Sequence, residues 1–69
     1  NMCEWINVSE RKPKPGQRFI GANEKDWNLF TAPNNDLKDE QGKIEMTKDQ
    51  HLDKILEVYK VTKWMIPLL

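Results

Sequence analysis

The sequence predicts an α+β domain, in which a small, mostly antiparallel sheet of three or four strands packs against one amphipathic helix. Three observations carry this prediction: strand-like residues at 5–8, strand-like residues at 61–67, and a helical repeat of apolar residues within 48–59. The stretch 61–67 combines β-branched residues with a tryptophan and ends at Pro67, which cannot donate to a ladder. We expect the two end stretches to meet in one sheet.

Residues 1–69 are expected to form a single domain, since compact domains run from about 50 to 250 residues. Asn1 is expected to be an artificial extension in front of Met2. A chain this short buries only about 60% of the surface that its unfolded form exposes. Cys3 is the one cysteine and His51 the one histidine, so one chain cannot form an internal disulfide or a zinc site of cysteine and histidine ligands. Stability must therefore come from packing or from a partner chain.

Three tryptophans, Trp5, Trp27 and Trp64, are expected to supply most of this packing, because each can bury a large apolar area. Two alternatives stay open. The rings could form a surface that binds a partner, or they could stack nucleic-acid bases while basic side chains follow the phosphate backbone.

Charge argues against nucleic acid as the main partner. The chain carries 11 basic and 11 acidic side chains, for a formal net charge of zero. Nucleic-acid binding normally needs a basic excess on at least one face. Residues 1–20 hold four basic and two acidic side chains, a surplus of two positive charges. The four basic residues are Arg11, Lys12, Lys14 and Arg18.

The sequence shows no apolar run of the length of a membrane span and no signal-peptide pattern. A lone cysteine is typical of a reducing compartment. We therefore expect no membrane association and a cytoplasmic location.

The N-terminal half reads as three strands. The first is expected at 3–8, with Trp5 on one face and Ile6 and Val8 on the other. A stiff, exposed turn around Pro13-x-Pro15-Gly16 leads to a second strand at 17–22, antiparallel to the first. A polar turn at 23–26 leads to a third strand at 27–31. Pro-x-Pro could also be a ligand for an aromatic groove.

Residues 33–45 are expected to form a polar loop, a solvated excursion from the domain. Several carboxylates lie close to Gly42. Placing Gly42 at the sixth position of a calcium loop puts Leu37 at the first, where a carboxylate is required, so the motif fails. A weak cation site is the alternative to a solvated acidic loop.

A helix is expected over residues 48–59. Thr47 and Gln50 have the spacing of a capping box. Leu52, Ile55, Leu56 and Tyr59 then recur at the spacing of one helical face. This face is expected to cover the protein's own sheet, and docking on a partner is the alternative.

Catalytic chemistry is not expected. A nucleophile, base and orienting group would require a histidine, and His51 is expected to be exposed in the first helical turn. Cys3 is expected to be a small apolar residue and not a reactive thiol. The glycines are scattered, so no phosphate-binding loop exists. We predict no enzyme, no cofactor and no metal ion.

Both ends of the chain carry a recognisable pattern. The opening, Trp5-Ile6-x-Val8-x-Glu10-Arg11-x-Pro13-x-Pro15-Gly16, resembles the opening W-I-x-V-x-(D/E)-R-L-P-x-P-G of a small family of unknown function from phages, prophages and bacteria. The closing Val61-Thr62-Lys63-Trp64-Met65-Ile66-Pro67-Leu68 is similar to that family's closing V-T-H-W-M-P-L-P. This resemblance implies a shared scaffold and a phage-related origin, and it implies no activity.

Three positions depart from the family pattern. Lys63 stands where the family has histidine, Ile66 is an extra residue, and Lys12 replaces a leucine. If the family histidine has a shared catalytic or metal-binding role, this chain cannot perform it.

The leading hypothesis is a non-enzymatic phage or prophage accessory protein that binds a host protein and modulates a host process or defence system. Its contact surface is expected on the acidic loop with exposed aromatics. The candidate contact residues are Trp27, Phe30, Asp36, Asp39 and Glu40. One alternative is a nucleic-acid-binding module using Arg11, Lys12, Lys14 and Arg18. Another is a structural homodimer that uses the closing strand as an edge.

Overall fold

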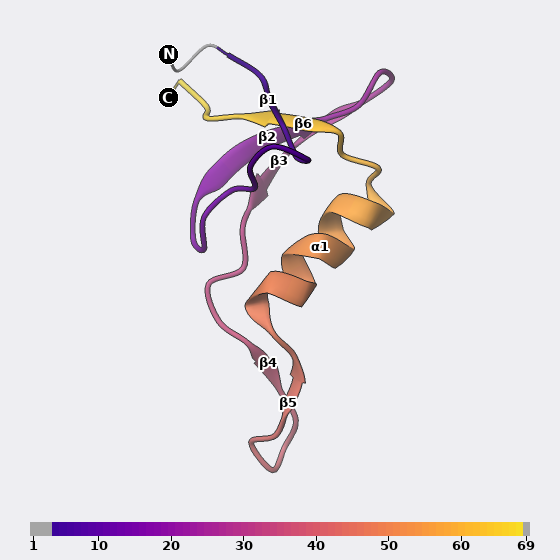
Figure 1. The fold of residues 1–69 in the computed structure, drawn as a ribbon. Helices are drawn as coiled ribbons and strands as arrows, with labels where there is room; N and C mark the ends of the chain where they lie inside the picture. The colour runs from indigo at the N-terminus through magenta and orange to yellow at the C-terminus, as the bar shows by residue number, and fades with distance from the viewer. Residues whose placement is uncertain (1–3, 69) are drawn as a thin grey trace.

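The structure is a computed structural model that describes residues 4–68. It contains one helix, a four-stranded antiparallel sheet and a separate two-stranded sheet. The helix α1 lies along one face of the larger sheet, and the smaller sheet projects beyond the start of the helix (Figure 1). The predicted α+β class is confirmed. Cys3 lies outside the described residues.

The larger sheet is built from both ends of the chain. Its strands are β1 (Ile6–Asn7), β6 (Lys63–Met65), β2 (Arg18–Ala22) and β3 (Trp27–Thr31), in that spatial order. The predicted meeting of the two ends is confirmed, because β1 pairs with β6 in antiparallel register.

Strand order corrects two predictions. β6 lies between β1 and β2 and is antiparallel to both, so β1 and β2 run in the same direction. The predicted antiparallel pairing of the first two strands is therefore wrong. The closing strand is also interior, so it is not the free edge that the homodimer hypothesis required.

The observed strand bounds agree best with the predicted ones in the β2–β3 hairpin. The third strand has the predicted bounds, and the second begins one residue later than predicted. The first is shorter, because the Glu10 main-chain N–H donates to the Asn7 carbonyl and the chain turns after β1. At the Pro-x-Pro turn, Gly16 has the positive φ that a tight reversal needs, while Pro13 is buried and not exposed.

Residues 33–45 do not form the expected loop, because Leu37–Lys38 (β4) and Ile44–Met46 (β5) pair as an antiparallel ladder. We call residues 37–46 the distal hairpin. Its turn is an Asp-x-x-Gly sequence, in which Asp39 Oδ1 accepts hydrogen bonds from the main-chain N–H groups of Gln41 and Lys43. Gly42 adopts a φ of 83°. Aspartate at the first and glycine at the fourth position favour such a turn, so a hairpin with a defined turn stands where a solvated excursion was expected.

The helix α1 spans Lys48–Val58, one residue less than predicted. Its capping box is present as expected: Thr47 Oγ1 accepts the Gln50 main-chain N–H at 3.1 Å, and Gln50 Oε1 accepts the Thr47 main-chain N–H at 2.9 Å. Asp36 adds a third connection, since its Oδ1 accepts the Lys48 main-chain N–H at 2.7 Å. These bonds satisfy donors that a helix start leaves without partners.

Replacing Thr47 with alanine is expected to lower the free energy of unfolding by about 1 kcal/mol, because the Gln50 N–H loses its acceptor. Urea unfolding followed by circular dichroism measures the change. Thr31→Ala is the control, because Thr31 is exposed on a strand. Equal effects of the two substitutions would contradict the capping role.

The core lies between α1 and the sheet. Leu52 and Leu56 of the helix pack on Phe19 and Trp64, which confirms that the helix covers the protein's own sheet. Phe19 stacks on Phe30 with ring centroids 5.2 Å apart and meets Trp64 edge-on at 6.2 Å. The buried core residues are Phe19, Ala32, Leu52, Leu56, Val61 and Trp64.

Only one tryptophan belongs to this core. Trp64 is 2% exposed, whereas Trp5 is 44% and Trp27 is 68% exposed. The prediction that all three form the core is wrong for two of them. A single helix covers a single face of the sheet, and Trp5 and Trp27 lie on the other.

Candidate binding face

The strand register defines what lies on the face away from α1. Directly paired residues of an antiparallel ladder project to the same face, and successive residues alternate. Phe19 and Gly21 face the helix, so Ile20 and Ala22 face away from it. We call this side of the sheet the open face. Its residues are Trp5, Asn7, Arg18, Ile20, Ala22, Trp27, Leu29, Thr31, Lys63 and Met65.

Apolar side chains form a continuous row across the open face. Ile20 pairs with Met65 on one side and with Leu29 on the other, so three strands each contribute one member. Leu29 is 48% exposed. In the next row Ala22 lies between Lys63 and Trp27.

A shallow pocket of about 410 Å³ lies on this face. Trp5 and Trp27 belong to its wall, and Ile20, Ala22 and Met65 contribute apolar surface. Lys63 and the turn 23–26 supply its polar part. The pocket is thus mainly apolar, with charged side chains in part of its wall.

The β2–β3 turn is held in place by its own hydrogen bonds. Asn23 Oδ1 accepts the main-chain N–H groups of Lys25 and Asp26, each at 2.8 Å. Asn23 Nδ2 donates to the Tyr59 carbonyl at 3.2 Å, which ties the turn to the end of α1. The charged rim of Glu24, Lys25 and Asp26 is therefore presented on an ordered turn.

Lys63 lines the pocket together with Trp5. Its Nζ lies 4.9 Å from the centroid of the Trp5 ring, within the range of a cation–π contact. Lys63 and the Trp5 ring are therefore in contact on the open face.

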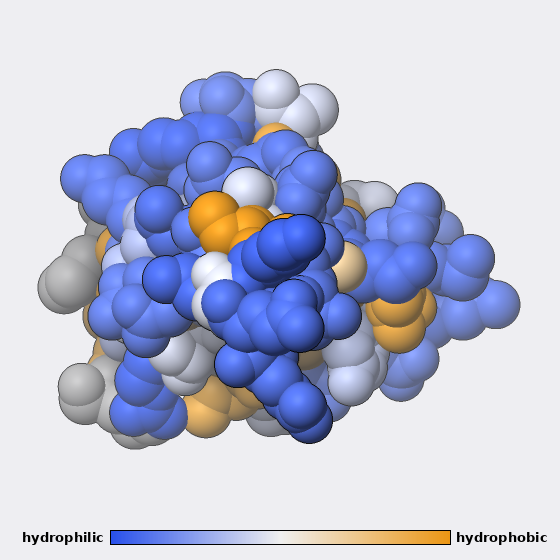
Figure 2. Space-filling view, turned by 90° about the horizontal axis from the view of Figure 1, so that it is seen from below, coloured by the Kyte–Doolittle hydropathy of each residue, from blue (hydrophilic) through white to orange (hydrophobic). Residues whose placement is uncertain are grey.

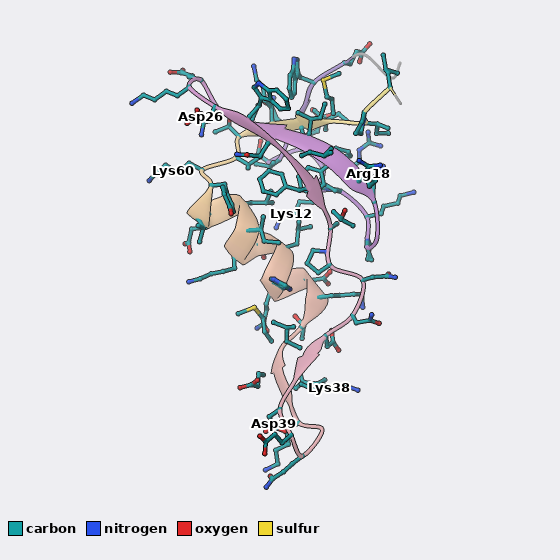
Figure 3. All side chains as sticks on the ribbon, turned by 180° about the vertical axis from the view of Figure 1, so that it is seen from behind. Lys12, Arg18, Asp26, Lys38, Asp39 and Lys60 are labelled. Carbon is teal, nitrogen blue, oxygen red and sulfur yellow. The ribbon has the colours of Figure 1, made fainter. Side chains whose placement is uncertain are left out.

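The residues predicted to bind a partner do not form one patch. Trp27 lies on the open face, and Phe30 is half-buried on the opposite side, edge-on to Tyr59 at 5.1 Å. Asp36 bonds the helix start, and Asp39 holds the turn of the distal hairpin, beside the exposed Glu40. Asp39 and Asp26, next to Trp27, lie at opposite ends of the molecule (Figure 3). The expectation of an exposed Phe30 is wrong.

The basic residues are also divided. Arg11 lies over the Trp64 ring, 5.8 Å from its centroid, and Lys12 forms an ion pair with Asp53 of α1. Lys14 is exposed beside the turn, where its main-chain N–H donates to Gln17 Oε1. Arg18 lies on the open face, opposite Thr31. Lys12 and Arg18 project from separate parts of the fold (Figure 3).

The hairpin end of the molecule has exposed apolar side chains of its own, Leu37 at 44% and Ile44 at 54% exposure. Seen from below, it is mostly hydrophilic, with apolar side chains in small separate areas (Figure 2). The continuous apolar row of Met65, Ile20 and Leu29 lies on the open face of the larger sheet.

His51 is half-buried and not exposed as expected, and its Nδ1 is buried without a hydrogen-bond partner in the structure. Within residues 4–68, no three side chains of His, Cys, Asp or Glu are grouped to hold a metal ion. Nor does any helix in this described range have the length and apolar character needed to cross a membrane.

Sequence reasoning missed Ile20, Leu29 and Met65 as site residues, although a signal existed. Residues 27–31 place Trp27 and Leu29 on one face of a strand and Phe30 on the other, so the strand is apolar on both faces. The one predicted helix can cover only one face of the sheet.

Comparison with known proteins finds no relative: no family model, no curated protein and no solved structure matches the chain.

Proposed function

We propose that the chain is a non-enzymatic protein-binding module whose partner contacts the open face. One observation carries the proposal: Trp5 and Trp27, 44% and 68% exposed, flank an apolar pocket of about 410 Å³ on the uncovered side of the sheet. Exposed tryptophans beside an apolar pocket are typical of binding surfaces, because covering them removes a large apolar area from water.

The charges around the pocket favour a protein over a polyanion. Two acidic residues, Glu24 and Asp26, and two basic residues, Lys25 and Lys63, line the pocket. A nucleic acid would bring its phosphates close to two carboxylates, which opposes binding. A protein surface with apolar and charged groups can satisfy both signs.

The resemblance of the two chain ends extends this proposal. It supports a phage or prophage accessory protein that acts in the cytoplasm of a bacterial host, where the partner is a host protein. Binding would modulate the process or defence system to which that protein belongs.

A capture experiment with paired variants tests the proposal. Tagged protein is incubated with nuclease-treated and untreated bacterial lysate, and the captured proteins are identified by mass spectrometry. Trp27→Ser is expected to weaken capture of a specific protein about 30-fold, since loss of a tryptophan hot spot costs about 2 kcal/mol or more.

Leu37→Ser is the matched control. Leu37 is 44% exposed, but it lies on the distal hairpin. Capture retained by Leu37→Ser and lost by Trp27→Ser supports the open face. Capture lost only with Leu37→Ser would move the site to the hairpin. Capture that disappears with nuclease would replace the protein partner by nucleic acid.

A further inference from the structure

The edge strand β3 lacks the features that keep a sheet edge from pairing. Natural edges are usually short, charged, bulged or interrupted by proline. β3 has five paired residues, Trp27–Thr31, with neither a charge nor a proline among them. The other edge, β1, is only two residues long. Four of the five β3 residues are exposed, all but Phe30.

The hydrogen-bond pattern shows which main-chain groups point away from the sheet. The Ala32 N–H donates to the Gln17 carbonyl at 2.8 Å, and the Asn23 N–H donates to the Asp26 carbonyl at 2.9 Å. Bonded pairs alternate along an antiparallel ladder, so Asn28 and Phe30 bond β2. The N–H and C=O groups of Trp27, Leu29 and Thr31 therefore point outward. Across residues 4–68 they have no hydrogen-bond partner.

A second copy of the chain matches this edge. Two β3 strands that pair antiparallel with full overlap place Leu29 opposite Leu29 and Trp27 opposite Thr31. The outward N–H and C=O groups of both strands are then all hydrogen-bonded to the other copy. No charged side chain lies opposite another charged side chain. The formal net charge of zero removes long-range repulsion between copies.

Pairing would also join the two open faces. The row of Met65, Ile20 and Leu29 ends at β3, so the rows of the two copies would meet at Leu29. We propose that two copies associate through β3, antiparallel and centred on Leu29, to form one eight-stranded sheet with a continuous open face. This inference rests on the strand edge and is independent of the proposed host partner.

Sedimentation velocity of the purified protein, from micromolar to millimolar concentration, tests the proposal. The mass is expected to rise with concentration from 8.2 kDa to twice that value. Leu29→Lys and Leu29→Glu should each remain monomeric, because like charges would lie opposite each other at the two-fold axis. An equimolar mixture should restore the dimer, since lysine would then face glutamate.

Circular dichroism of each variant shows whether it is folded. Leu37→Lys, which places the same charge on the distal hairpin, should dimerise like the unmodified chain. A monomer at every concentration would overturn the proposal. Unchanged dimerisation of both Leu29 variants, or a mixture that stays monomeric while the parent chain dimerises, would also overturn it. Purified protein suffices, so failure here is distinct from failure to capture a host protein.

Discussion

Trp64→Ala is expected to unfold most of the protein at 25 °C. Trp64 is 2% exposed, and its strand β6 joins β1 to β2. Its Nε1–H donates to the Arg11 carbonyl at 2.8 Å, which holds the chain after β1 against the core. Truncating a buried tryptophan costs about 3–5 kcal/mol, comparable to the whole stability of a domain this small. Urea unfolding followed by far-ultraviolet circular dichroism measures the loss.

Trp27→Ala is the matched control, because it removes the same side chain from a position that is 68% exposed. Its effect on the free energy of unfolding should stay within about 0.5 kcal/mol. Equal destabilisation by the two substitutions would contradict the assignment of Trp64 to the core and of Trp27 to the open face.

Gly21→Ala is expected to destabilise the protein by about 1–3 kcal/mol through overpacking. A Cβ at position 21 would lie 2.9 Å from Phe30 Cε2 and 3.2 Å from Val61 Cγ1. Gly21 pairs directly with Trp64, so neither the sheet nor the aromatic ring can move away without disturbing the core. Thermal or urea unfolding measures the effect.

A second substitution identifies the clash. Phe30→Ala alone removes a ring that stacks on Phe19, and it should also destabilise. In the double variant the new methyl group at position 21 no longer meets the Phe30 ring, so the combined loss should be smaller than the sum of the two single losses. Simple additivity would show that the Phe30 ring is not what resists a side chain at position 21.

Local signals predicted the helix and two strands well. The helix start depends on Thr47 and Gln50, which are three residues apart, and the structure contains both of their bonds. The third strand, residues 27–31, lies between a polar turn and Pro33 and has the predicted bounds. Both features are set by residues adjacent in sequence, which is why the sequence alone reveals them.

Strand order and burial depend on distant residues and were harder to predict. Alternation assigns a residue to a face but does not identify its neighbouring strand, so the insertion of β6 between β1 and β2 has no local signal. The tryptophans illustrate the same limit. Composition alone favoured a core that contains all three tryptophans. Burying Trp5 and Trp27 would require a second layer over the sheet, which residues 4–68 do not contain.

Of the predicted contact residues, Trp27 lies on the open face and the others lie elsewhere. Asp36 and Asp39 appeared to belong to a free acidic surface, but their carboxylates accept main-chain hydrogen bonds at the helix start and in the hairpin turn. Aspartates beside a capping residue or before glycine often have this role. The apolar row of Ile20, Leu29 and Met65 depends on register, which appears only once the strands are paired.

The most direct test of the open face uses the indole N–H signals of the three tryptophans. A captured partner is titrated into the ¹⁵N-labelled protein, and the three signals are followed by nuclear magnetic resonance. Trp5 and Trp27 should shift or broaden, while Trp64, whose indole N–H bonds the Arg11 carbonyl, should keep its position. Unchanged Trp5 and Trp27 signals with shifts confined to residues 37–46 would contradict the account and assign binding to the distal hairpin.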